Sequence, residues 1–262
     1  MYGSGWCDGP IGKDTVSFAG LTVEQQEFVV AEEIASIFGY VPIDGILGLA
    51  WPSISVGKCG SKNFKNKAVE FQNLKNSDQY GNVTPPMQNL FPVLDAPVFT
   101  VWLDRKLNIS FGGNGGLITY GGIDSSNCEE KIDYVSLTSK TYWQFAISGF
   151  SIKSYSEERT DDVISDTGTS WIGTPFGIMR AVVNQTGANF DHEKHIYTVN
   201  CSTMMSQPDL EFIINGIEYN ITSEEYVLDL DLGGGKMIPI FEAAQGKEDN
   251  EPVVLELCWA HH

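Results

Sequence analysis

The stretch Val163-Ile164-Ser165-Asp166-Thr167-Gly168-Thr169-Ser170-Trp171 decides the interpretation of this chain. Its two β-branched apolar residues predict a strand that enters a turn. Asp166 follows the strand, so the sheet behind it would fix its side chain, and Gly168 lets the backbone turn tightly. The surrounding hydroxyl side chains can donate to a carboxylate or to a substrate backbone. The segment therefore predicts a turn that presents one acid.

This pattern is uncommon enough to guide the rest of the interpretation. A bare Asp-Thr-Gly occurs by chance in roughly one chain in twenty of this size. The longer pattern of Asp, Thr or Ser, Gly, Thr or Ser, and Ser occurs by chance in about one chain in a thousand. The alternative interpretation of Asp166 is a turn aspartate without a catalytic role.

Five segments, in one order, resemble motifs of the pepsin-like aspartic peptidases. Residues 163–171 resemble the second catalytic loop of that family. The other four are Tyr2-Gly3-Ser4-Gly5, similar to the tip of the flap hairpin; Ile43–Pro52, similar to the heart of the first lobe; Gly121-Gly122-Ile123-Asp124, similar to the entry to the interlobe region; and Tyr142-Trp143-Gln144-Phe145, similar to the strand that opens the second lobe. The resemblance extends from Tyr2 to about Leu232.

The resemblance implies a mainly β, bilobal pepsin-like acid protease fold that is incomplete at both ends. Residues 1–126 would be the remainder of the N-terminal lobe, and residues 127–262 the C-terminal lobe with its Asp-Thr-Gly loop. Residues 57–80 have no counterpart in the family. A solvated loop, a basic docking element and translated non-coding sequence remain open for them. The tail from about residue 233 also departs, because it lacks the family's cysteine and its Ile-Leu-Gly-Asp-like segment.

The resemblance also implies roles for the site residues. Asp166 would be one member of a catalytic pair of aspartates. Thr169 and Ser170 would orient it and contact the substrate backbone, while Tyr2 would cover the bound peptide as the flap residue. The full set implied to bind substrate is Tyr2, Gly3, Ser4, Gly168, Thr169 and Ser170. Trp171 replaces a smaller aliphatic residue, a departure that we expect to alter packing rather than chemistry.

Peptide hydrolysis by a pair of aspartates needs two carboxylates, one as general base and one as general acid. A single aspartate cannot fill both roles. In the family the first Asp-Thr-Gly turn lies ahead of the flap, and this sequence does not contain it. One hypothesis is a fragment of an acid endopeptidase, inactive as written and catalytic when complete. The other is a non-catalytic homologue that binds peptides or has a regulatory role. In either case we expect a monomer with a peptide or protein partner, and neither a metal nor a cofactor.

The charge composition limits the classes of partner that we expect. Sixteen Lys and Arg against 34 Asp and Glu give a formal net charge of −18. This charge repels nucleic acid and anionic membranes, so we expect neither as a partner. An acidic compartment would relieve the self-repulsion by protonation, although an acidic surface that only confers solubility is the alternative.

Sequons and cysteines bear on the compartment. Five asparagines begin an Asn-x-Ser/Thr acceptor without an intervening proline, where chance would supply about two; they are Asn82, Asn108, Asn184, Asn200 and Asn220. We therefore expect the secretory pathway, ending outside the cell, in the gut lumen or in a lysosome. The five cysteines show no Cys-x-x-Cys spacing, which argues against zinc, and in an oxidising compartment they would pair and leave one over.

Local patterns predict several elements. Hairpins are expected at Thr15–Ala31, with Gly20 in the turn, and at Leu210–Ile221, with Asn215-Gly216 in the turn. Helices are expected to begin at the N-caps Thr84 and Thr174, and the second is expected to run toward Gly187.

Two further runs are apolar or rich in histidine. The Gly45–Gly48 run is suited to burial beneath a catalytic turn. The run His192-Glu193-Lys194-His195 is one residue short of a His-Glu-x-x-His zinc motif and its setting is strand-like, so we do not expect a metal there.

Overall fold

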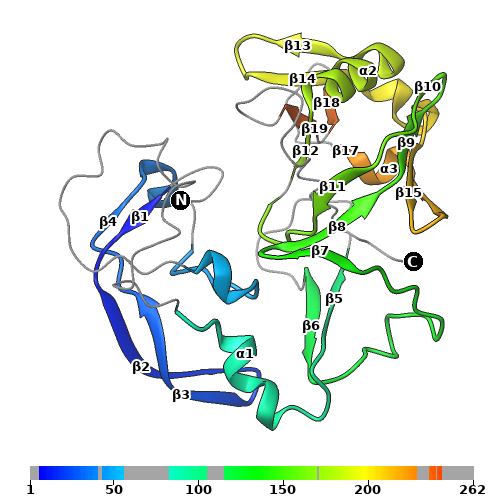
Figure 1. Ribbon diagram of the computed structural model, residues 1–262. Helices are drawn as coiled ribbons and strands as arrows, with labels where there is room; N and C mark the ends of the chain where they lie inside the picture. Colours follow the sequence, from blue (N-terminus) through cyan, green and yellow to red (C-terminus); the bar gives the residue numbers. More distant parts are fainter. Residues whose placement is uncertain are drawn as a thin grey trace. The chain divides into compact units, whose positions relative to one another are not determined.

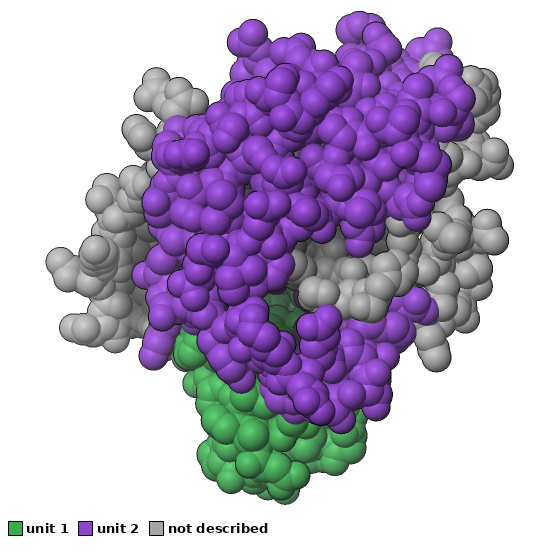
Figure 2. All heavy atoms as spheres, turned by 90° about the vertical axis from the view of Figure 1, so that its right-hand side faces the viewer, with its two compact units in different colours: residues 1–99, 120–122 green, residues 100–119, 123–262 purple. Residues whose placement is uncertain are grey.

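The computed structural model describes residues 6–40, 43–55, 83–104, 115–169, 171–228, 236–239 and 241–243. The chain divides into two compact units, coloured separately in Figure 2. Unit 1 is residues 1–99 with 120–122, and unit 2 is residues 100–119 with 123–262. Strands dominate both units, which confirms the prediction of a mainly β fold.

Unit 1 contains one long β-hairpin, a pair of two-residue strands and short helical segments (Figure 1). Its elements are β1 (Cys7–Asp8), β2 (Ile11–Phe18), β3 (Leu21–Val29), β4 (Glu33–Ile34), the 3-10 helices η1 (Ser36–Gly39) and η2 (Pro52–Ile54), α1 (Pro86–Leu90) and the 3-10 helix η4 (Phe91–Val93). β2 pairs with β3 and β1 pairs with β4. β5 (Phe99–Leu103) and β6 (Gly116–Tyr120) form a further two-stranded sheet, all of which belongs to unit 2 except Phe99 and Tyr120.

The β2–β3 hairpin confirms the turn predicted at Gly20. Ala19 and Gly20 have φ of 50° and 77°, the left-handed conformation that a tight hairpin turn requires. A buried amide then attaches the hairpin to α1. Gln26, 3% exposed, donates from Nε2 to the carbonyl oxygen of Thr84 at 2.9 Å, and its Oε1 accepts from Nδ2 of Asn89 at 2.9 Å. These bonds satisfy the amide where water does not reach it.

The run Gly45–Gly48 is not buried, which corrects the expectation from its composition. Ile46 and Leu47 are 54% and 45% exposed, and Ile43 beside them is 48% exposed. An apolar run leaves water only where another element covers it, so composition alone does not decide its burial.

Unit 2 contains most of the strands. Its elements are β7 (Leu137–Lys140), β8 (Trp143–Ile147), β9 (Gly149–Ile152), β10 (Tyr155–Glu157), β11 (Asp161–Ile164), β12 (Ile172–Thr174), α2 (Phe176–Thr186), β13 (Asn189–Asp191), β14 (Ile196–Asn200), the 3-10 helix η5 (Cys201–Ser206), β15 (Leu210–Ile214), β16 (Ile217–Ile221), α3 (Ser223–Tyr226), β17 (Val227–Leu228), β18 (Lys236–Pro239) and β19 (Phe241–Ala243). The sheets have the orders β10-β9-β15-β16, β11-β8-β7, β13-β14-β18-β17 and β12-β19 (Figure 1).

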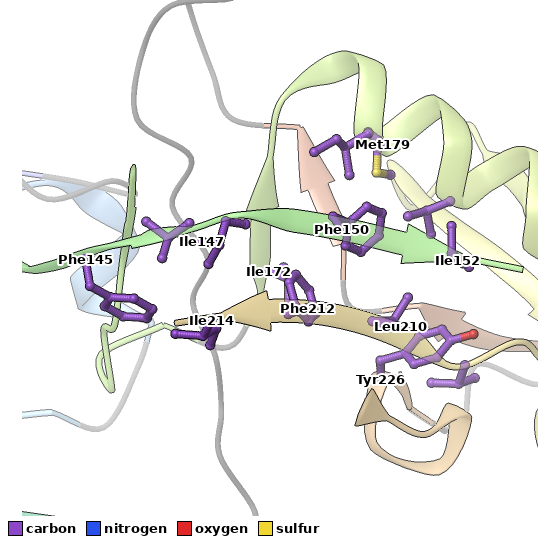
Figure 3. Close-up of a cluster of buried hydrophobic side chains, with 14 of the residues drawn as sticks. Phe145, Ile147, Phe150, Ile152, Ile172, Met179, Leu210, Phe212, Ile214 and Tyr226 are labelled. Atoms are coloured by element: carbon purple, nitrogen blue, oxygen red, sulfur yellow. The ribbon is translucent and has the colours of Figure 1, made fainter. Parts of the chain in front are cut away.

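The core of unit 2 lies between these sheets and α2, as Figure 3 shows for its main side chains. β15 buries every second residue, namely Leu210, Phe212 and Ile214, as the period of a strand requires. Each such side chain stabilises the fold by about 1.5–3 kcal/mol when fully buried. Tyr226 is 0% exposed, and its hydroxyl donates to the carbonyl oxygen of Pro208 at 2.6 Å.

Both predicted helices form, but each begins two residues after its predicted cap. α1 has Pro85 as N-cap in place of Thr84, and α2 has Pro175 in place of Thr174. Thr174 cannot cap because it belongs to β12, where its side chain is buried. α2 ends as predicted at Gly187, whose φ of 68° is the left-handed conformation of a helix C-cap.

The hairpin of β15 and β16 confirms the turn predicted at Asn215-Gly216. These two residues have φ of 51° and 77°. Asparagine and glycine are the residues that adopt this conformation at least cost, so the turn is readable from the sequence.

Candidate active site

Strand β11 fixes the chain directly ahead of Asp166. β11 pairs antiparallel with β8, with Val163 opposite Phe145 and Ile164 opposite Gln144. Val163 is 0% exposed and Ile164 is 7% exposed, so both are held in the core. The backbone N–H of Ser165 donates to the carbonyl oxygen of Trp143 at 3.0 Å. Asp166 is therefore the first residue beyond the anchored strand.

The turn itself holds one oxygen of the carboxylate. The backbone N–H of Gly168 donates to Oδ1 of Asp166 at 2.8 Å. Within the described part of the chain, Oδ2 of Asp166 accepts no hydrogen bond, and the residue is exposed. As far as the described residues show, the turn thus orients the carboxylate and leaves one oxygen open to a water, a substrate or a second acid.

Gly168 has a specific steric role in this turn. A Cβ atom added at this position would lie 3.0 Å from Oδ1 of Asp166, closer than ordinary van der Waals contact. Because Gly168 has no Cβ, Oδ1 of Asp166 keeps its position without this close contact. The sequence predicted glycine here for a tight turn, and the contact between its position and the carboxylate of Asp166 is seen only in the structure.

The chain beyond the turn is anchored as well. Thr169 is half-buried, and Trp171 packs against the core cluster. Ile172 and Thr174 of β12 are each 2% exposed. β12 pairs in parallel with β19, where Ile172 lies opposite Phe241. The exposed turn is thus held by buried residues at both ends.

The structure describes part of the predicted site. Asp166, Gly168 and Thr169 share one turn. The remaining predicted substrate-binding residues, Tyr2, Gly3, Ser4 and Ser170, lie outside the described residues. The catalytic role of Asp166 and the substrate-binding roles stay predictions.

Two residues that support the turn were not assigned to the site from the sequence. Trp143 holds Ser165 through its main-chain carbonyl, and Ile172 anchors the chain after the turn by its burial. A carbonyl carries no side-chain signal, so Trp143 could be found only from the pairing of β8 with β11. The apolar character of Ile172 was visible, but its partners were not.

The histidine run lies in the turn between β13 and β14, not in a strand. His192 and His195 approach the ring of Phe190 at centroid distances of 5.0 Å and 6.4 Å. Their described contacts are thus with an aromatic ring.

Three of the five cysteines lie in the described part. Cys7, Cys128 and Cys201 are free thiols there, so the structure shows no pairing among them. Cys59 and Cys258 lie outside the described residues.

Residues 1–254 match the family described as eukaryotic aspartyl protease. The chain is 51% identical over 249 residues to Aspartic protease 1 of Caenorhabditis elegans, which covers 94% of this chain and 57% of that protein. It is 47% identical over 237 residues to Aspartic protease 17 of the same organism, covering 90% and 54%. Against gastricsin of Homo sapiens it is 33% identical over 234 residues, covering 87% and 53%.

The chain belongs to the eukaryotic aspartyl protease family. This confirms the predicted resemblance to the pepsin-like aspartic peptidases, and the mainly β structure is consistent with their fold. The match continues beyond Leu232, where the sequence motifs end. The chain spans a little over half the length of the relatives that it matches. Among the described residues, no helix has the length and apolar character needed to cross a membrane.

Proposed function

We propose that the protein is an aspartic endopeptidase, which hydrolyses peptide bonds of protein substrates at acid pH. Asp166 is one of its two catalytic carboxylates. The observation that carries the proposal is the exposed carboxylate of Asp166, whose Oδ1 accepts the N–H of Gly168 at 2.8 Å directly after a buried strand. The family match and the names of the relatives support the same activity.

The chemistry follows from pairing two carboxylates. When two such groups share a site, repulsion between the charges keeps one of them protonated. The ionised member takes a proton from a water as that water attacks the peptide carbonyl. The protonated member donates to the substrate, so the pair combines general base and general acid. The open Oδ2 of Asp166 suits either task.

The neighbouring residues complete the proposal. Thr169 and Ser170 orient Asp166 and contact the backbone of the bound peptide, together with Gly168. Tyr2, Gly3 and Ser4 cover the peptide from the flap. The hydroxyls and backbone N–H groups of these residues are suitable donors for an extended peptide.

The second carboxylate remains to be supplied. The printed sequence carries Asp-Thr-Gly once, at residues 166–168. The proposal therefore concerns the protein with a second catalytic aspartate in place, and we expect the 262-residue chain alone to be inactive. The comparisons with named proteases do not favour a non-catalytic peptide-binding homologue.

We further propose that the protein is a monomer of the secretory pathway that acts outside the cell, in the gut lumen or in a lysosome. The sequons and the net charge of −18 support this location. The charge also disfavours nucleic acid and anionic membranes as partners.

The test compares Asp166→Asn with Asp191→Asn in protein made from its complete coding sequence. Asp191 is a matched control, because its Oδ1 accepts the N–H of Glu193 at 3.0 Å with the same two-residue spacing. Hydrolysis of a denatured protein substrate is measured at acid pH, with circular dichroism to confirm folding. We expect Asp166→Asn to lower kcat/KM by about 10²- to 10⁴-fold and Asp191→Asn to leave it unchanged. Full activity of Asp166→Asn would remove Asp166 from the proposal.

A further inference from the structure

The asparagines of the described residues differ in how they use the side-chain nitrogen Nδ2. Four of them lie outside Asn-x-Ser/Thr sequons, and each donates Nδ2 to the protein. Nδ2 of Asn89 reaches Oε1 of Gln26 at 2.9 Å, that of Asn127 reaches Oδ2 of Asp124 at 2.6 Å, that of Asn189 reaches the carbonyl oxygen of Gly187 at 3.3 Å, and that of Asn215 reaches the carbonyl oxygen of Tyr134 at 3.4 Å. In these four asparagines, Nδ2 is therefore committed to a structural bond.

The three described sequon asparagines behave in the opposite way. Asn184, Asn200 and Asn220 are all exposed, and none donates from Nδ2 to another residue in the described structure. Asn200 uses only its other terminal atom, since Oδ1 accepts the backbone N–H of Ser202 at 2.9 Å and its hydroxyl at 2.8 Å. The nitrogen is thus open in each sequon that the structure describes.

The surroundings of these residues leave room for a large substituent. Asn220 lies in β16, at the edge of the sheet β10-β9-β15-β16. Its neighbours Tyr219 and Ile221 pack against the core, so the alternation of the strand turns Asn220 outward. Asn184 is likewise exposed on α2, two residues before the buried Thr186. A group added to either nitrogen extends into solvent and displaces no core contact.

We propose that unit 2 carries N-linked glycans at Asn184, Asn200 and Asn220. In each case Nδ2 forms a bond to C1 of an oligosaccharide supplied by a lipid diphosphate donor. The bond between C1 and the diphosphate oxygen breaks, the lipid diphosphate leaves, and the amide loses one proton. The hydrogen bonds of Asn200 survive the reaction, because they use Oδ1 and not the nitrogen that is modified.

The test is glycan mapping of the protein expressed from its complete coding sequence in a eukaryotic secretory host. The purified protein is treated with peptide N-glycosidase in ¹⁸O-labelled water, and its peptides are analysed by mass spectrometry. We expect ¹⁸O-labelled aspartate at positions 184, 200 and 220 and a fall in apparent mass on gels. We expect one glycan fewer, seen as one fewer shift in apparent mass, in each of the variants Asn184→Gln, Asn200→Gln and Asn220→Gln.

Two variants serve as matched controls. Asn189→Gln alters an exposed asparagine whose Nδ2 is bonded, and we expect it to leave the glycan pattern unchanged. Thr222→Ser keeps both the sequon of Asn220 and a hydroxyl N-cap for α3, so the glycan at Asn220 should remain. Unmodified peptides at all three positions would overturn the proposal, as would glycans confined to Asn82 and Asn108. A chain that never enters the secretory lumen would also count against it.

Discussion

Two turns in unit 2 hold an aspartate by the same local hydrogen bond. Oδ1 of Asp166 accepts the N–H of Gly168 at 2.8 Å, and Oδ1 of Asp191 accepts the N–H of Glu193 at 3.0 Å. Each aspartate also lies near the end of a short strand: β11 ends at Ile164, two residues before Asp166, and Asp191 is the last residue of β13. Hydrogen bonding of an aspartate to its own backbone is a common property of turns. It does not by itself define a catalytic site.

The two turns differ in what lies behind them. Ahead of Asp166, Val163 and Ile164 are 0% and 7% exposed, whereas Phe190 ahead of Asp191 is 40% exposed. The carboxylate of Asp191 also lies 3.9 Å from Nζ of Lys194. The two turns thus share the hydrogen bond within them and differ in the burial of the residues ahead of them, and we expect that burial to fix the position of Asp166.

Substitution of Gly168 tests the turn of Asp166 most directly. In Gly168→Ala, the new Cβ would lie 3.0 Å from Oδ1 of Asp166 and push the carboxylate from its position. A displacement of this kind lowers kcat/KM by about 10²-fold. Gly177→Ala is the control, because a Cβ there meets no atom within 4 Å. Both variants are made from the complete coding sequence, and equal activity of the two at acid pH would contradict a positional role for Gly168.

Truncation of the supporting strands tests the core behind each turn. Val163→Ala removes two buried methyl groups and should lower the free energy of unfolding by about 2–3 kcal/mol. Phe190→Ala acts on a partly exposed ring and should cost less than about 1 kcal/mol. Urea denaturation monitored by tryptophan fluorescence measures both values. Equal losses in the free energy of unfolding for the two variants would contradict the proposed difference in burial behind the two turns.

Substitution of Tyr226 should have the smallest effect on the free energy of unfolding, and that effect should depend on pH. Burial, with a smaller contribution from Asp209, raises the pKa of Tyr226 well above its usual value of 10. The folded state therefore keeps this proton while the unfolded state releases it above about pH 10. The stabilisation is fully present below that pH and declines as the pH rises further.

Tyr226→Phe removes both the titration and the bond to Pro208. We expect a loss of about 1 kcal/mol in the free energy of unfolding at pH 7. We also expect the fall in stability between pH 9 and pH 11 to become shallower than in the parent protein. Urea unfolding at these pH values provides the measurement. An unchanged slope would show that Tyr226 does not set the alkaline stability.

Predictions that rest on local backbone chemistry agree with the structure. Gly20, Asn215-Gly216 and Gly187 adopt the positive φ values that their turns and helix end require. Those preferences belong to the residues themselves, so no distant contact was needed to read them. Two predictions that depend on contacts with distant residues were wrong. Thr174 is buried in β12 and does not cap α2, and Ile46 is exposed despite its apolar run.

The sequence by itself determined the family and the strand that leads into Asp166. These properties follow from residue types at fixed spacing. Only the tertiary structure decided that Val163 and Ile172 are buried on either side of the turn and that the carbonyl of Trp143 binds Ser165. It also decided that the three described sequon asparagines donate Nδ2 to no described residue. Burial and hydrogen-bond partners arise from segments far apart in the chain, and spacing along the sequence does not record which of them meet.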